Sequence, residues 1–129
     1  MKILEIMNRA KFVRQGAGMV FVCDLSGLEP DDVRSVVSRS RDIISRMPAN
    51  SVHMLMNLSG IRDCGSTKMC TRELLKEVGP HLYKGAVSGL ADILEKAVWE
   101  GALSVARKDL GYFATYEDAL CWLVEPRAA

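Results

Sequence analysis

Two cysteines and two histidines of this sequence could together supply metal ligands or a nucleophile. Cys64 and Cys70 are separated by five residues, and His53 and His81 lie within or beside apolar segments. Thiolates and imidazoles bind zinc, and a cysteine at a helix start can become an activated nucleophile. The separation of the two cysteines fits none of the usual zinc spacings, so we expect no metal and no other cofactor. We expect His53 to be a core side chain bonded to the backbone, and His81 to be exposed.

A serine-glycine pair followed by an aliphatic residue occurs three times, each time after an apolar run. The pairs are Ser26-Gly27, Ser59-Gly60 and Ser88-Gly89, which recur 33 and 29 residues apart. A strand, a tight turn and a returning helix occupy about 30 residues in a βαβ unit. The recurrence therefore predicts parallel strands connected through helices. The serines either form a polar rim at the carboxyl ends of the strands or only cap the turns, and we favour the capping role.

Apolar periodicity predicts the elements between these turns. Two apolar runs flanking a glycine-containing link over residues 12–24 indicate a hairpin, and Glu29-Pro30-Asp31 is typical of a helix start. Segment 2–7 fits either an extension of the first strand or a separate piece. We expect further helices over about 30–47, 69–78, 90–103 and 116–123, strands over 52–56, 81–87 and 110–114, and a polar loop over 57–67.

Length and charge limit the function classes. The chain has 129 residues, enough for a single domain over 1–129, and its net charge of +1 provides no field that attracts nucleic acid. No apolar run approaches the ~20 residues that span a bilayer, so we expect no stable membrane insertion. Four scattered cysteines without a CxxC pair are typical of free thiols in a reducing compartment, and we expect a cytoplasmic protein.

Four segments follow the predicted order of elements: VCDLSGL at 22–28, SVHMLMN at 51–57, PHLYKGAVSGL at 80–90 and FATYEDALCWL at 113–123. Together they resemble the STAS-like family, in its uncharacterised branch related to anti-sigma-factor antagonists and, more distantly, to CRAL-TRIO lipid-transfer domains. The likeness covers about residues 12–124. The resemblance implies an α/β fold with a mixed, mostly parallel sheet of about five strands, an N-terminal hairpin and about four helices. It also implies a non-enzymatic regulatory module that binds proteins.

Anti-sigma-factor antagonists carry Asp-Ser-Ser/Thr-Gly-aliphatic before their second helix and are phosphorylated on the first serine. The matching residues here are Asp63-Cys64-Gly65-Ser66-Thr67, with a thiol in place of the acceptor hydroxyl. Ser66 or Thr67 could replace that acceptor, because phosphate is favoured near a helix N-terminus. The resemblance thus places the candidate interaction and phosphorylation loop at Asn57, Ser59, Asp63, Cys64, Ser66 and Thr67.

Two function classes follow. The first is a cytoplasmic STAS-like interaction module that binds either another protein or a second copy of itself through this loop and the helix after it. The second is a small hydrophobic-ligand or lipid-binding protein, since Met54, Met56, Met69 and Trp99 could line an adaptable apolar cavity. An enzyme is not expected, because no set of acid, base and nucleophile is apparent.

Overall fold

The computed structural model describes residues 1–62, 65–107 and 109–125. Its elements, in chain order, are α1 (Ile3–Arg9), β1 (Ala10–Gln15), β2 (Gly18–Asp24), α2 (Pro30–Ile44), β3 (Val52–Asn57), α3 (Gly65–Val78), the 3₁₀ turn η1 (Gly79–His81), β4 (Leu82–Ser88), α4 (Ile93–Leu103), β5 (Gly111–Phe113) and α5 (Tyr116–Leu123).

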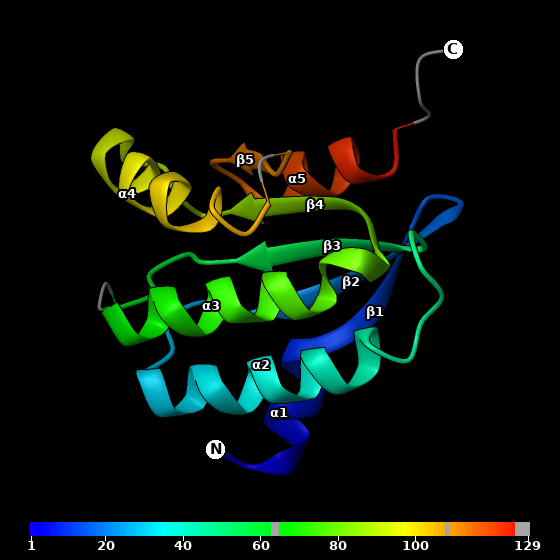
Figure 1. Cartoon of the computed structure of the whole chain (residues 1–129), viewed down its shortest axis with the longest axis horizontal. Helices are drawn as coiled ribbons and strands as arrows, with labels where there is room; N and C mark the ends of the chain where they lie inside the picture. The colour runs from blue at the N-terminus through cyan, green and yellow to red at the C-terminus, as the bar shows by residue number, and fades with distance from the viewer. Residues whose placement is uncertain (63–64, 108, 126–129) are drawn as a thin grey trace.

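The strands form one five-stranded sheet in the order β1-β2-β3-β4-β5 (Figure 1). β1 and β2 are an antiparallel hairpin, and every other neighbouring pair is parallel. The predicted α/β class with a mixed, mostly parallel sheet of five strands and an N-terminal hairpin is therefore confirmed.

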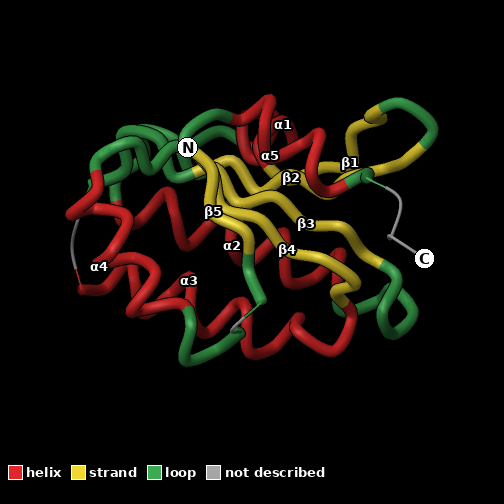
Figure 2. Tube along the Cα trace, turned by 90° about the horizontal axis from the view of Figure 1, so that it is seen from above, coloured by secondary structure: helices red, strands yellow, loops and turns green. Residues whose placement is uncertain are grey.

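Helices cover both faces of the sheet unequally. α2, α3 and α4 lie side by side on one face, and α5 lies on the other (Figure 2). The larger core, under α2 to α4, includes Phe21, Val36, Met54, Leu74 and Trp99. The smaller core, under α5, includes Val20, Leu55, Ala86, Leu120 and Leu123. Apolar residues thus point to both faces of β2 and β3, as expected for central strands.

The helix starts follow local chemistry. Pro30 opens α2 with Asp31 and Asp32 in its first turn, where carboxylates complement the helix dipole. Asp92 caps α4, since its Oδ1 accepts hydrogen bonds from the Leu94 and Glu95 amides at 2.8 and 3.0 Å. The proline of α2 and the Asp92 cap of α4 thus mark where these two helices begin.

The described residues form five α-helices, whereas the sequence predicts about four. The additional helix is α1, which packs against α2 beside the β1 edge of the sheet (Figure 1). Its N-cap, Lys2, makes no capping hydrogen bond through its side chain, and none of its residues is buried. The sequence therefore lacks both a start signal and a core stripe for this helix.

One further expectation is corrected. α3 begins at Gly65 instead of Met69, because Thr67 and Thr71 occupy its buried face and the Thr71 hydroxyl donates to the Thr67 carbonyl at 3.1 Å. β4 lies between β3 and the edge strand β5. Its Lys84 keeps its charge satisfied by donating to the Trp122 carbonyl at 2.8 Å and lying over the Trp122 ring.

Candidate functional site

The three serine-glycine turns lie side by side at the carboxyl edge of the parallel strands. Gly27, Gly60 and Gly89 all have positive φ, at 66°, 62° and 92°. The Gly27 amide donates to the Ser59 carbonyl at 2.9 Å, so the first turn is bonded to the second. Glycine adopts this backbone without steric cost. The first two motifs form the same turn, closed by bonds from Leu28 to Leu25 and from Ile61 to Leu58, whereas Ser88 is still the last residue of β4.

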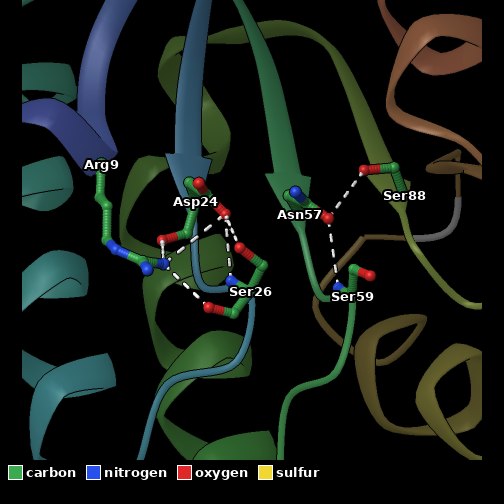
Figure 3. Close-up of polar contacts among 6 residues, drawn as sticks. All are labelled: Arg9, Asp24, Ser26, Asn57, Ser59 and Ser88. Carbon is green, nitrogen blue, oxygen red and sulfur yellow. Dashed lines mark hydrogen bonds and ion pairs between the residues drawn. The ribbon is translucent and has the colours of Figure 1, made fainter.

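Polar side chains meet at this edge because the sheet register aligns them. Asp24 pairs with Asn57 across β2 and β3, and Asn57 pairs with Ser88 across β3 and β4. Figure 3 shows these side chains together with Arg9, Ser26 and Ser59. The register thus produces a polar row that crosses three strands.

Asp24 is the acceptor for the first turn. Its Oδ1 accepts from the Ser26 amide at 3.0 Å and from the Ser26 hydroxyl at 2.6 Å. Arg9, at the end of α1, donates through its NH1 to the carbonyl oxygens of Asp24 at 3.3 Å and of Ser26 at 2.9 Å (Figure 3). These bonds hold α1 against the turn and occupy the carboxylate.

Asn57 has the same role in the second turn. Its Oδ1 accepts from the Ser59 amide at 3.2 Å and from the Ser88 hydroxyl at 3.4 Å (Figure 3). Ser88 is fully buried, so its hydroxyl needs a partner inside the protein. Burial, and then the carboxylates of Asp24 and Glu117, raise the pKa of Tyr116 above its ordinary value. The polar row is a network that fixes turns, and its groups satisfy one another.

The structure divides the predicted interaction loop. Asn57 ends β3 and Ser59 belongs to the second turn, whereas Ser66 and Thr67 lie in the first turn of α3 and not in a loop. Ser66 is exposed, and Thr67 is buried. Asp63 and Cys64 lie outside the described residues. Of the two hydroxyls considered as phosphate acceptors, Ser66 is the accessible one.

The other candidate thiols and imidazoles are dispersed. Burial raises the pKa of Cys23 to about 12, and it also raises the pKa of the half-buried Cys70. His53 is half-buried, and the centre of its ring lies 5.0 Å from that of Tyr83. A hydrogen bond to the backbone was expected for His53 but is found at His81, whose Nδ1 lies 2.7 Å from the carbonyl oxygen of Met47. Among the described residues, no three His, Cys, Asp or Glu side chains are placed to hold a metal ion.

The outer face of α4 is the feature that sequence reasoning missed. Three large aliphatic residues of this helix are exposed: Ile93 at 81%, Leu94 at 75% and Val98 at 50%. Val105, just beyond the end of the helix, is 68% exposed. Ala97 and Gly101, which lie between them on the helix, are exposed as well. The opposite face is buried through Trp99 and Leu103. The helix is therefore apolar on both its inner and its outer side, a pattern that the sequence contains and that is typical of a helix covered on both sides.

A groove of mixed character lies between α1 and α2. It has a volume of about 450 Å³, and its apolar residues are Ile3, Ile6, Met7 and Ile43. Its polar residues are Ser35, Ser38, Arg39, Asp42 and Arg46. The methionines expected to line a cavity are elsewhere: Met54 and Met56 are in the packed core, and Met69 is exposed on α3.

Comparison with known proteins gives no relative: no protein-family model, curated protein or solved structure matches the chain. In the described part of the chain, no helix has the length and apolar character needed to cross a membrane.

Proposed function

We propose that this protein is a cytoplasmic, non-enzymatic interaction module of the STAS-like kind, and that it binds a protein partner through the outer face of α4. This face consists of Ile93, Leu94, Ala97, Val98, Gly101 and Val105, and we refer to it as the α4 face. The order of the elements, a hairpin followed by alternating helices and strands, supports the STAS-like assignment.

One observation carries the proposal: the bulky aliphatic side chains of Ile93, Leu94 and Val98 are exposed together on the solvent side of α4, with Val105 just beyond the helix. Single exposed apolar residues are common on protein surfaces, but contiguous ones mark binding surfaces. The largest exposures are those of Ile93 and Leu94, in the first turn of the helix. Covering these side chains would remove apolar area from water at about 25 cal/mol per Å², which favours association.

The beginning of α3 lies beside α4 and extends the proposal to the predicted loop. α3 and α4 are neighbours in the helical layer, and Lys68 Nζ lies 5.4 Å from the centre of the Trp99 ring, on the buried side of α4. Ser66 and Met69 are exposed on the first turns of α3. A phosphate on Ser66 would add negative charge to a helix that neighbours α4, which makes this serine our candidate for regulation.

The non-enzymatic assignment is supported by the polar row. Asp24 and Asn57 each accept hydrogen bonds from the turns that follow them. A catalytic base needs a free lone pair directed at a substrate, whereas these oxygens are directed at their own backbone.

Site-specific photo-cross-linking in the native cells tests the proposal. A photoreactive side chain at Val98 should yield a discrete protein adduct. The same group at Asp31, an exposed position on α2, serves as the matched control and should yield none. Equal labelling from both positions, or none from Val98, would contradict the proposal.

A hydrophobic-ligand carrier is the second candidate, and the groove between α1 and α2 favours it. Its volume of about 450 Å³ falls within the ~300–1,000 Å³ range of small-molecule sites. Native mass spectrometry of gently purified protein tests this candidate. A co-purifying lipid supports it, and an unliganded mass after several lipid challenges contradicts it.

A further inference from the structure

We infer that the partner of the α4 face is a second copy of this chain, which receives α4 in its groove between α1 and α2. This inference rests on the proposed function of the α4 face and specifies its occupant. The resulting contact joins two different surfaces, so it is head-to-tail.

The position of the two surfaces is the first argument. The helices contact one another in the order α1, α2, α3, α4, with α1 beside the β1 edge of the sheet, so α1 and α4 lie at opposite ends of this series of contacts. Figure 1 shows α1 at the bottom of the molecule and α4 at the top left. The two surfaces therefore cannot meet within one chain, but they can meet between copies.

The second argument is the lack of a polar cap on the layer. In stacked architectures, each helical unit covers its neighbour, and a terminal unit needs a polar outer face. α4 instead carries Leu94 and Val98 on its outer face, as an internal helix would. A further helical surface that packs on α4 would continue the layer.

The groove has the lining that such a helix requires. Ile3, Ile6, Met7 and Ile43 provide apolar contacts for aliphatic side chains that recur with helical spacing. Amphipathic helices bind to grooves through anchors of this spacing, and residues 94 and 98 of the α4 face follow it, with Val105 just beyond the end of the helix. Ala97 and Gly101 add no bulk between these anchors, so the helix can approach the groove closely.

Charge complementarity favours this occupant over an anionic membrane or a basic partner. Asp92, Glu95 and Glu100 accompany one basic residue, Lys96, along α4. The groove has the opposite balance, with Arg39 and Arg46 beside Asp42. The net negative charge along α4 would face the net positive charge of the groove, and complementary charges steer and orient two associating proteins.

The contact is small. One eleven-residue helix covers less than the ~800 Å² that each partner contributes to a standard interface. We therefore expect micromolar association. Because the two surfaces are different, each added copy leaves one α4 face and one groove open, and assembly continues with concentration.

Two matched variants test the arrangement by sedimentation velocity between about 1 and 500 μM. Leu94→Glu places a carboxylate in the first turn of α4, and Ile3→Glu does the same in the first turn of α1. Both wild-type side chains are exposed by more than two thirds, so neither change removes core packing. Circular dichroism and urea unfolding verify folding, and Val98→Glu or Met7→Glu replaces a variant that does not fold.

The expected result has three parts. The average mass of the wild type rises with concentration beyond that of two chains. Each variant alone associates at least about tenfold more weakly, because a buried carboxylate would face apolar groups. An equimolar mixture forms a dimer and nothing larger, because the intact groove of Leu94→Glu accepts the intact α4 of Ile3→Glu.

Other results overturn the inference and separate it from the proposed function. If Ile3→Glu still dimerises alone while Leu94→Glu does not, α4 pairs with itself, and the proposed function stands. If the wild type is strictly monomeric and the photoreactive group at Val98 labels a different protein, the inference of self-association is wrong and the proposed function is retained. A co-purified small ligand displaced by Ile3→Glu assigns the groove to that ligand instead. Wild-type association unaffected by Leu94→Glu, with no adduct at Val98, overturns both proposals.

Discussion

Gly89 packs directly on the backbone of Ser59, because the third serine-glycine turn lies against the second. A Cβ on residue 89 would lie 2.6 Å from the Ser59 Cα, and Gly89 has a φ of 92°. The turns therefore depend on glycine for two reasons, the backbone angle and the space.

Gly89→Ala should destabilise the fold by about 3 kcal/mol. The left-handed backbone costs a side chain about 1–2 kcal/mol, and displacing the Ser59 backbone adds a similar amount. The free energy of unfolding from urea titration measures the effect.

Two other glycines serve as controls for this substitution. Gly60→Ala has the same backbone problem but no atom closer than 3.9 Å, so it should cost about 1–2 kcal/mol. Gly101→Ala has nothing within 4 Å in a helix, so it should stabilise by up to about 1 kcal/mol. Equal losses at positions 60 and 89 would show that the turns are not packed as described.

Asp24→Ala should destabilise the protein by about 1–3 kcal/mol, because it removes a charged acceptor from the Ser26 amide and hydroxyl. Urea unfolding measures this loss. Asp24→Asn is the matched comparison, since it keeps an acceptor oxygen and should recover part of the stability. A neutral effect of the alanine variant would mean that the polar row does not fix the turns.

His53 should make stability depend on pH. Burial, and then the charge of Lys84, lower its pKa from 6.5, so the unfolded chain binds the proton more tightly than the folded protein. The stability associated with neutral His53 is present above pH 6.5 and is lost as the pH falls through the folded pKa. His53→Gln should therefore lose less stability than the wild type between about pH 7.5 and 5. Parallel pH profiles for the two proteins would contradict this assignment.

The thiols should differ in their rate of alkylation at neutral pH. Cys121 is exposed and should react first, whereas Cys23 is buried, with its pKa raised to about 12, and should react only after unfolding. Mass spectrometry of peptides over time gives the order. Rapid labelling of Cys23 in the folded protein would show that the larger core is open at β2.

The same experiment tests the enzyme alternative, because an activated Cys64 would react faster than Cys121.

Most of the sheet could be predicted from the sequence. The apolar runs before Ser26, Ser59 and Ser88 have the spacing of βαβ units, and they form β2, β3 and β4. Glycine at these turns is required by the backbone, so the repeat carries a physical signal. α1 could not be predicted, because a seven-residue helix without a side-chain cap leaves no such signal.

The site was harder to predict, because exposure depends on neighbouring elements. Leu94 and Trp99 are both apolar residues of one helix, and only the packing of α3 decides which of them is buried. The predicted loop was selected by resemblance, and its Thr67 is part of the buried face of α3. The sequence alone indicates that an apolar residue in a helix is buried, and only the tertiary structure shows whether another element covers it.

The most direct test of the account extends photo-cross-linking along α4 in the native cells, one position at a time. Adducts should appear at Leu94, Val98 and Val105 and should be weak at Glu95, so that labelling follows the helical period of the α4 face. The control at Asp31 should remain unlabelled. Labelling without this period, or none along α4, would contradict the claim that this face is the protein's binding surface.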